Sequence, residues 1–120
     1  MVSEKYKDVQ IILASWWNNI DEETISAVYN DVPFPGYELS HAEVMETSMV
    51  MYFEPELVDL TRLVDEGHDE VRPYYIFPTP DDFVPDSGLN ARAYGSTAEK
   101  GKILVKKIID NFTKICDLFE

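Results

Sequence analysis

The sequence has few basic residues, a single cysteine and no long apolar run. Ten Lys and Arg stand against 23 Asp and Glu, so the net charge is −13 at neutral pH. A chain of that charge repels phosphate backbones and anionic lipids, which argues against nucleic acid and membrane surfaces as partners. Its apolar stretches also fall far short of the roughly 20 residues that a membrane span requires. We therefore expect no nucleic acid and no membrane among its partners.

The only cysteine, Cys116, excludes a disulfide framework within the chain. A chain built without disulfides suits a reducing compartment, so the expected location is cytoplasmic. Because Cys116 lies in an apolar C-terminal stretch, we expect it to be a buried core thiol.

Apolar and aromatic side chains, by contrast, are plentiful. Of the 120 residues, 45% are hydrophobic and 12% are aromatic, which is too rich for a disordered segment. This length is enough for one modest core and not for two. We therefore expect a single domain, or part of one, over residues 1–120.

Two segments near the N-terminus have the pattern of an α/β unit. Residues 8–14 contain a short, β-branched and nearly continuous apolar run, which is typical of a parallel strand buried on both faces. After a polar break, Asp21 and the acidic residues that follow it supply the cap of a helix at about residues 21–29. The order of strand, turn and helix predicts the α/β class.

A capping box predicts a second helix at about residues 41–53. In Ser40-x-x-Glu43, the serine would accept from the third amide while the glutamate reaches back to the amide of the cap. Pro55 would end this helix. The expected buried stripe consists of Ala42, Met45, Met49, Tyr52 and Phe53.

The rest of the chain predicts a long loop and a third helix. The loop, at about residues 65–95, carries four prolines and allows at most one short strand, at residues 74–77. Loops of this length usually serve a function or an interface. A second capping box, Ser96-x-x-Glu99, opens a helix at about residues 97–119. Its expected apolar stripe is Leu104, Ile108, Phe112, Ile115 and Phe119.

His41 is the first candidate for chemistry. It stands in the first turn of the expected helix, where the helix dipole favours a neutral imidazole that can accept a proton from water. The alternative is a structural histidine bonded to a loop carbonyl. Glu46, one turn further on, lies near the apolar stripe, so its carboxylate needs a partner. That partner can be a catalytic group, a residue around a metal, a buried backbone amide or an arginine.

Two further positions deserve a prediction. Trp16 and Trp17 follow the expected strand at the end where open α/β sheets bind ligands. Adjacent residues on extended backbone point to opposite sides, so only one of the two can face the core. His68 lies in an acidic turn that imitates a metal site, but freely rotating side chains are poorly preorganised for a metal. We expect His68 to be solvated.

Several ordered motifs resemble the creatininase (creatinine amidohydrolase) family. Its C-terminal signature usually reads His-Ala-Gly or His-Gly-Gly, two variable residues and Glu-Thr-Ser, and the chain has HAEVMETSM at residues 41–49 and PELVDL at residues 55–60. The family's Ala-Thr-Ala-Glu-Lys-Gly resembles STAEKG at residues 96–101, and SWW at residues 15–17 resembles a strand end of the family. The resemblance covers nearly the whole chain.

This resemblance implies an α/β fold: the C-terminal half of a creatininase-like three-layer α/β/α domain with a mainly parallel sheet. It also implies hydrolysis of a cyclic amide or related C–N bond with two divalent metal ions, zinc or manganese. His41 falls on the family's catalytic histidine, which would move a proton between water and the leaving nitrogen. Trp17 and Tyr37 fall on the substrate pocket, and Glu46 falls on a glutamate that would anchor the helix or His41.

The chain also departs from the family. Glu43 replaces the usual glycine, and Tyr37 stands where creatininase itself has a second tryptophan. Relatives hydrolyse formamides and a cyclic sugar ketone, yet the retained SWW motif favours creatinine as the substrate. The metal ligands of the family, a Glu-x-His pair, an aspartate and an Asn-Gly-His segment, belong to its N-terminal half and have no counterpart here. The chain is therefore expected to be a split subunit, a truncated reading frame or a fragment.

Two hypotheses follow for function. In the first, the chain is part of a metal-dependent amidohydrolase that converts creatinine to creatine, completed by a partner chain that carries the N-terminal half. In the second, it is a catalytically inactive fragment or interaction subunit that keeps the fold. Open strand edges invite pairing, so the isolated chain is also expected to form a homo-oligomer.

Overall fold

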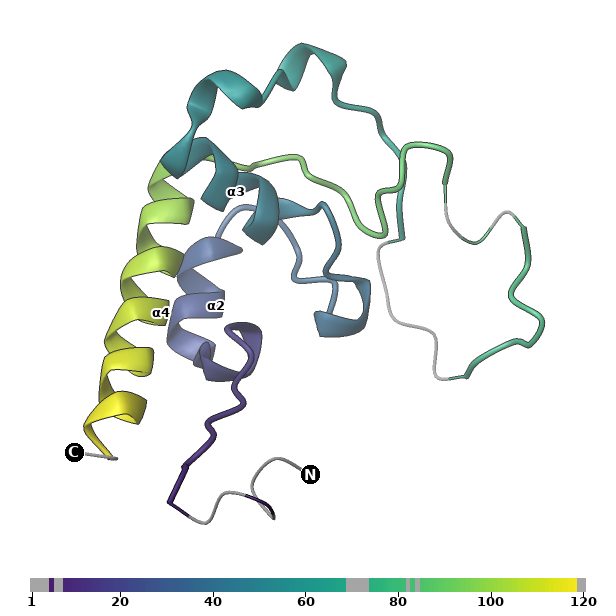
Figure 1. Ribbon diagram of the computed structural model, residues 1–120. Coiled ribbons are helices and arrows are strands. Elements are labelled where there is room, and N and C mark those ends of the chain that lie inside the picture. Colours follow the sequence, from purple (N-terminus) through teal and green to yellow (C-terminus); the bar gives the residue numbers. More distant parts are fainter. Residues whose placement is uncertain (1–4, 6–7, 69–73, 82, 84, 119–120) are drawn as a thin grey trace.

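The computed structural model describes residues 5, 8–68, 74–81, 83 and 85–118. In Figure 1 three α-helices lie together, and a long segment swings away from them after α3 and returns to the start of α4. In chain order the elements are η1 (Trp17–Asn19), α2 (Glu22–Val28), η2 (Tyr37–Leu39), α3 (Val44–Phe53), η3 (Pro55–Leu57), η4 (Leu60–Arg62) and α4 (Ala98–Asp117).

The described residues contain no β-strand, and their single isolated bridge joins His68 to Ala91 in parallel orientation. The strand expected at residues 8–14 is therefore not formed, and Leu13 is 98% exposed instead of buried. A strand exists only when a neighbour pairs with it. No backbone hydrogen bond joins residues 9–14 to any other described residue. These residues have the sequence pattern of a strand, but no neighbouring strand in the described ranges pairs with them.

Helix α2 starts as its sequence predicts. The Asp21 side chain accepts a hydrogen bond from the Thr24 amide at 3.0 Å and another from the Thr24 hydroxyl at 2.7 Å. These bonds satisfy an amide that the helix itself leaves without a partner. Lys107 of α4 forms an ion pair with the same carboxylate, and this side-chain bond, followed by those from Thr24, holds the pKa of Asp21 well below its usual value. The cap therefore also joins α2 to α4.

Helix α3 starts three residues later than its capping box predicted. Its N-cap is Glu43, whose two carboxylate oxygens both lie 3.1 Å from the Met45 amide. Ser40 does not cap the helix, because its hydroxyl donates to Glu43 Oε1 at 2.9 Å. The expected apolar stripe is also only partly correct. Met45 is buried, but Tyr52 is 40% and Phe53 is 61% exposed.

Helix α4 is capped by Thr97, whose side chain accepts from the Lys100 amide at 3.1 Å, rather than by Ser96. The Ser96 hydroxyl donates instead to the Ala93 carbonyl at 2.7 Å. Cys116, expected in the core, is exposed. The part of the expected helix at residue 119 lies outside the described residues. None of the helices in the described ranges is long and apolar enough to span a membrane.

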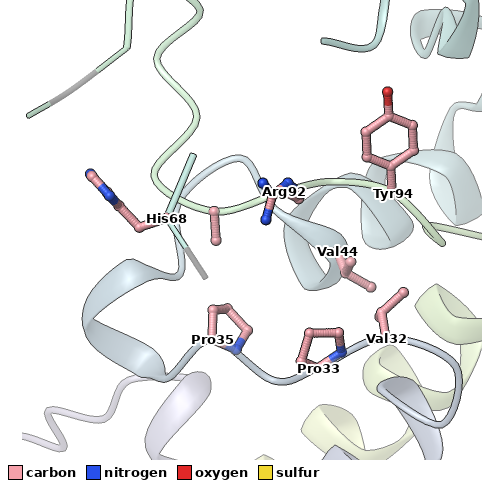
Figure 2. A pocket seen from close by; sticks show the side chains of 8 residues that line it. Val32, Pro33, Pro35, Val44, His68, Arg92 and Tyr94 are labelled. Carbon is pink, nitrogen blue, oxygen red and sulfur yellow. The ribbon is translucent and has the colours of Figure 1, made fainter. Parts of the chain in front are cut away.

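The long segment before α4 folds back on itself near His68. The His68 amide donates to the Asn90 carbonyl at 2.8 Å, and its Nε2 lies 2.7 Å from the Phe83 carbonyl oxygen. His68 is therefore half-buried and bonded, not solvated as expected. Figure 2 shows the hollow of about 140 Å³ beside this contact. It is lined by Val32, Pro33, Pro35, Val44, His68, Ala91, Arg92 and Tyr94.

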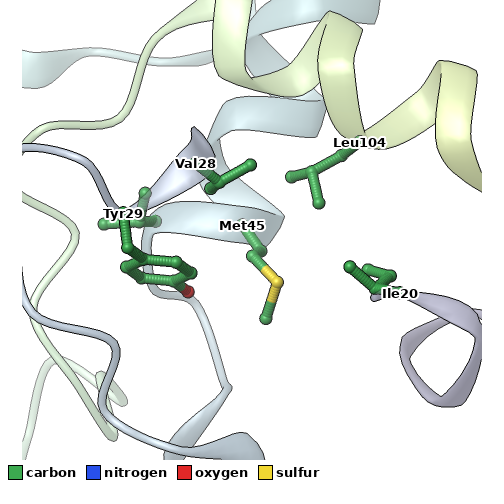
Figure 3. Packing of buried hydrophobic residues seen from close by; sticks show 6 residues of the cluster. Ile20, Val28, Tyr29, Met45 and Leu104 are labelled. Atoms are coloured by element: carbon green, nitrogen blue, oxygen red, sulfur yellow. The ribbon is translucent and has the colours of Figure 1, made fainter. Parts of the chain in front are cut away.

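A small core holds α2, α3 and α4 together. Its buried side chains meet between the three helices, as Figure 3 shows. They are Ile20, Val28, Tyr29, Val44, Met45 and Leu104. Trp16 and Phe34 are partly buried and pack against this cluster. The apolar periodicity of α4 thus correctly identified Leu104, which is fully buried.

The backbones of α3 and α4 come close together where the two helices cross. A Cβ added at Gly101 would stand 2.0 Å from the Ser48 carbonyl oxygen, so only glycine lets the two backbones come this near. The fully buried Ser48 hydroxyl accepts a hydrogen bond from the Thr97 amide at 3.1 Å. Lys100, also buried, reaches across to form an ion pair with Asp31. The STAEKG motif therefore fixes α4 against its neighbours.

We expect Gly101→Ala to destabilise the fold, although alanine is the better helix former by about 1 kcal/mol. The clash with the Ser48 carbonyl is overpacking, which costs about 1–3 kcal/mol or more. Circular dichroism during heating should show Tm lower by about 5–15 °C. The matched control is Thr113→Ala, at an exposed site on the same helix, which should leave Tm unchanged or slightly higher. Equal Tm values for the two variants would contradict the close crossing.

Candidate active site

The candidate site centres on the turn that carries His41. The His41 amide donates to the Leu39 carbonyl at 2.9 Å, and its carbonyl accepts from the Asn90 amide at 3.3 Å. The imidazole itself is exposed. Because α3 begins at Val44, His41 lies before the helix and not in its first turn as expected. The backbone of the turn is held on both sides while the side chain stays accessible.

Ala42, the next residue, has the left-handed backbone conformation with φ of 56°. That conformation costs a residue with a side chain roughly 1–2 kcal/mol. Glu46 and Thr47 hold it from α3: Glu46 Oε2 accepts from the Ala42 amide at 2.6 Å, and the Thr47 hydroxyl donates to the Ala42 carbonyl at 3.2 Å. Of the partners open to Glu46 from sequence, the structure shows the backbone amide. Glu46 therefore fixes the turn beside His41.

Glu43 is the site residue that sequence reasoning missed. Its carboxylate is fully buried and accepts hydrogen bonds from the Tyr29 hydroxyl, the Ser40 hydroxyl and the Met45 amide. A buried carboxylate is stable only with such a complete set of donors. The available signal was the glutamate that stands in place of the family's glycine. Its partner Tyr29 is 14 residues earlier, and no local pattern links the two.

Burial of the phenol, and then the nearby Glu43 charge and its hydrogen bond, raise the pKa of Tyr29 far above that of a free tyrosine. The hydroxyl therefore stays protonated and remains a donor throughout the neutral range. Together, Tyr29 and Glu43 connect the end of α2 to the start of α3. The turn with His41 lies directly before this buried link.

Tyr37 lies on η2, four residues before His41, and the Ser40 amide donates to the Tyr37 carbonyl at 3.1 Å. Its ring meets that of Phe34 at 5.2 Å edge to face, and Phe34 in turn lies 4.9 Å from Tyr29. Burial, followed by the charge of Asp21, raises the pKa of Tyr37. The Tyr37 ring is nevertheless 39% exposed. The Tyr37 backbone is thus held by a hydrogen bond, while one part of its ring stays accessible to solvent.

As expected, only one of the two tryptophans packs against the core, but alternation along extended backbone is not the cause, because Trp16 has helical φ and ψ angles of −61° and −39° and Trp17 begins η1. Trp16 packs against the core, whereas Trp17 is 44% exposed. The two rings meet edge to face, with centroids 5.7 Å apart. Trp17 thus belongs to η1, just before α2, and offers an aromatic surface supported by the partly buried Trp16 ring.

The structure therefore brings Tyr37 and His41 onto one short turn and places Trp17 on a separate element. Within the described ranges, no hydrogen bond or ring contact joins these three side chains. A hollow of about 230 Å³ lies against the other side of the His41 turn. It is lined by Ala42, Thr47, Val58, Asp59, Leu60, Arg62, Leu63, Val64, Ser87, Leu89 and Ala93.

A metal site does not fit the side chains that the structure describes. Metal centres in hydrolases need several His, Cys, Asp or Glu ligands that converge on one point. In the described ranges, no group of three or more such residues is close enough to hold an ion. Glu43 and Glu46, which follow His41 in the sequence, already accept hydrogen bonds from backbone amides.

Comparison with known proteins points to one family. A family model described as creatinine amidohydrolase (creatininase) matches residues 3–116. The creatinine amidohydrolase of Pseudomonas putida is 28% identical over 100 residues, which are 83% of this chain and 38% of that protein.

Solved structures agree with that match. A creatininase structure titled with Mn is similar with a TM-score of 0.79 at 27% identity, over 95% of this chain and 46% of that one. A glutamate-to-glutamine creatininase mutant of Zn–Zn type has a TM-score of 0.79 at 26% identity, over 95% and 45% of the two chains. A mutant creatininase in complex with creatine has a TM-score of 0.78 at 27% identity, over 95% and 46%. The chain thus spans less than half the length of these relatives.

We expect Tyr29→Phe to lower the free energy of unfolding by about 1–3 kcal/mol at neutral pH, because Glu43 loses a buried donor. The folded-state pKa of Tyr29 is raised above the unfolded value near 10. This stabilisation is therefore complete below about pH 10 and is lost as the pH rises further. Urea unfolding at several pH values should show that the wild type and Tyr29→Phe converge above about pH 10.

Tyr37→Phe is the control for this experiment, since the Tyr37 hydroxyl has no hydrogen-bond partner among the described residues. It should change the neutral-pH stability by less than about 0.5 kcal/mol. A Tyr29→Phe variant as stable as Tyr37→Phe would show that the buried link is not formed.

We also expect Glu46→Ala to cost about 1.5–3 kcal/mol, because the Ala42 amide loses a charged acceptor. Glu46→Gln retains an acceptor oxygen and should restore most of that loss. Glu56→Ala, at an exposed position in η3, should change the urea midpoint little. If Glu46→Ala and Glu56→Ala have the same midpoint, Glu46 does not hold the turn.

Proposed function

Because the chain belongs to the creatininase family, we propose that it is one part of an amidohydrolase that opens a cyclic amide, with creatinine as the preferred substrate. The family match over residues 3–116 is the observation that supports this most strongly. Addition of water to creatinine breaks one ring C–N bond, forms a C–O bond and moves one proton to the leaving nitrogen, which gives creatine. The proposal assigns the proton transfer to this chain.

His41 is the residue proposed to carry that proton. Its imidazole is exposed while the backbone on both sides of it is bonded, so the ring can reach a substrate from a fixed origin. An imidazole near neutrality can take a proton from the attacking water and return it to the leaving nitrogen. Glu46 serves as a positioning residue, because it holds the Ala42 amide directly after His41.

Trp17 and Tyr37 are proposed to bind the flat ring of a small substrate. Both present partly exposed aromatic faces, and both are supported by a more buried ring, Trp16 and Phe34 respectively. Aromatic walls of this kind suit a planar, partly cationic ring through stacking and cation–π attraction. The tyrosine makes a smaller wall than a tryptophan, which is why a formamide or another cyclic substrate is the alternative to creatinine.

The divalent metal, zinc or manganese by the names of the similar structures, is assigned to the rest of the domain. The described residues of this chain do not fit a metal, so no step is routed through one here. In the same proposal, the three-layer α/β/α arrangement with its parallel sheet is completed only when that remainder is present. The remainder is supplied by a partner polypeptide or a further part of the same one.

A second candidate is an interaction subunit without catalysis. It is favoured by the observation that the family motifs at residues 46–48 and 96–101 serve mainly to hold α3, α4 and the His41 turn together. A subunit that only maintains packing would keep these motifs. It would have no need of His41 or of the exposed Trp17.

Replacement of the two histidines separates these candidates. We expect His41→Ala to lower kcat for creatinine by about 10²–10⁴-fold in the protein purified from its own host, because proton transfer in the transition state is lost. The readout is creatine formation, with native mass spectrometry to show that the assembly is unchanged.

His68→Ala is the matched control, since the chain has only two histidines and His68 bonds to the Phe83 carbonyl instead of facing the turn. It should keep kcat within a few-fold of the wild type. Equal activity of both variants would remove His41 from catalysis. An intact, metal-loaded assembly with no turnover of creatinine, formamides or cyclic sugar ketones would favour the interaction subunit.

A further inference from the structure

Two positions at which the chain departs from the creatininase pattern belong to one closed set of contacts beside His41. At these positions Glu43 stands in place of a glycine, and Tyr37 stands in place of a tryptophan. This set, the Glu43 network, consists of Tyr29, Glu43, Ser40, Tyr37 and Phe34, each in contact with the next and the last in contact with the first. The network therefore links the end of α2, η2 and the start of α3 around the turn that carries His41.

The polar half of the Glu43 network runs through the glutamate. The Tyr29 hydroxyl donates to Glu43 Oε2, and the Ser40 hydroxyl donates to Glu43 Oε1 at 2.9 Å. The Ser40 amide in turn donates to the Tyr37 carbonyl at 3.1 Å. In the described part of the chain, no buried side-chain nitrogen or oxygen is left without a hydrogen-bond partner. A buried polar network whose members are all satisfied in this way is rigid.

The aromatic half closes the network. Phe34 lies between the two tyrosines, with ring centroids 4.9 Å from Tyr29 and 5.2 Å from Tyr37. Both separations fall in the range of favourable aromatic pairs, about 4.5–7 Å. Phe34 also packs against the apolar core, which anchors this half to the helices. Tyr37 is therefore held through its backbone by Ser40 and through its ring by Phe34.

We propose that Tyr29 and Glu43 are positioning residues, which set the separation between the Tyr37 ring and the His41 imidazole. This role rests on the function proposed above, in which Tyr37 binds the substrate ring and His41 moves the proton. Ser40 directly precedes His41 and Glu43 follows it by two residues, so the network holds the turn at both ends. Alignment of reacting groups supplies much of an enzyme's rate, and a misplacement of about 1 Å can cost about 100-fold.

A buried carboxylate suits positioning better than it suits stability. Withdrawal of a charge from water has a free-energy cost that hydrogen bonds only partly offset, and apolar replacements of buried charged groups are often neutral or stabilising. The glycine that is usual in the family avoids this cost. Glu43 adds direction instead, because it is fully buried and accepts from the Tyr29 hydroxyl, the Ser40 hydroxyl and the Met45 amide. Three donors around one carboxylate hold the turn in a single geometry.

The test measures turnover by the protein purified from its own host, with creatinine or with whichever other tested substrate the wild type hydrolyses. Tyr29→Phe and Glu43→Ala break the polar half of the network and keep the Tyr37 ring on Phe34. We expect both variants to lower kcat by about tenfold or more while KM stays within about twofold, because the substrate still stacks on Tyr37 but meets a misaligned His41.

Glu43→Gln is the conservative variant. Its amide oxygen can accept from Ser40 and from the Met45 amide, and its amide nitrogen can donate to the Tyr29 hydroxyl. The network is then kept without the charge, so kcat should stay within about threefold of the wild type. A purely electrostatic effect of the carboxylate would give no such rescue.

Leu104→Ala controls for a loss of stability alone. Leu104 is fully buried on α4 and is not a member of the network. The cavity left by this change should lower Tm at least as much as Tyr29→Phe does. Measured well below both Tm values, its kcat should nevertheless stay within about twofold of the wild type. If Glu43→Ala fails to fold, the comparison of Tyr29→Phe with Leu104→Ala decides the test.

Amide hydrogen exchange in the same assembly gives a second readout that needs no turnover. The Ser40 and His41 amides donate to the Tyr37 and Leu39 carbonyls within the turn. Tyr29→Phe should speed exchange at residues 40–41 by at least about tenfold relative to the amides of α4. Leu104→Ala should speed exchange in α4 at least as much as in the turn.

Unchanged exchange at residues 40–41 in Tyr29→Phe, an equal loss of kcat in Leu104→Ala, or a Glu43→Gln variant no better than Glu43→Ala would overturn the positioning role. Failure of the proposed function looks different. An assembly that hydrolyses none of the tested substrates, yet shows selectively faster exchange at residues 40–41 in Tyr29→Phe, would refute the hydrolase and support the network as what fixes the turn. Turnover that Tyr29→Phe leaves at the wild-type rate would support the hydrolase and overturn the positioning role.

Discussion

The contact between Gly101 and the Ser48 carbonyl is the constraint on which the rest of the structure depends. It sets how closely α4 lies against α3, and the core side chains Met45 and Leu104 meet only at that separation. Polar contacts at the same crossing reinforce it, since Ser48 binds the Thr97 amide and Lys100 reaches Asp31. A core this small supplies limited hydrophobic stabilisation. The helix crossing therefore relies on backbone approach and on buried polar contacts more than on apolar volume.

Helix α3, fixed by this crossing, in turn holds the backbone of the turn that carries His41. Ser48 directly follows Glu46 and Thr47 in α3, and the side chains of those two residues hold the amide and the carbonyl of Ala42. Glu43 accepts a hydrogen bond from the Met45 amide and another from the Tyr29 hydroxyl. Glu46, a candidate for chemistry from the sequence, and Glu43, which the sequence did not single out, thus both hold backbone amides. The His41 side chain on this turn is exposed to solvent, which is what a proton carrier needs.

Sequence patterns correctly predicted the features that depend only on residues close together in the sequence. The Asp21 cap and the buried Leu104 follow from spacing alone. The start of α3 was misplaced because Ser40-x-x-Glu43 fits a capping box, whereas Tyr29, 14 residues away, draws the glutamate into the core. Residues 9–14 have the propensity of a strand but no pairing partner in the described chain. Cys116 lies in an apolar C-terminal stretch, yet its side chain is exposed. Each of these wrong predictions depends on tertiary contacts, which a local sequence pattern does not contain.

The bond between the Thr97 amide and Ser48 has one more consequence, because it closes a loop. The chain leaves α3 at Phe53 and returns to α3 at Ser48 some forty residues later, so the ends of the intervening segment are fixed by the helix crossing. The entropy of closing such a loop grows only with the logarithm of its length, by about 0.6 kcal/mol for each doubling. Insertions and deletions between η3 and α4 therefore change the free energy of loop closure only a little. This is the segment in which related proteins can diverge in length while the geometry at His41 is preserved.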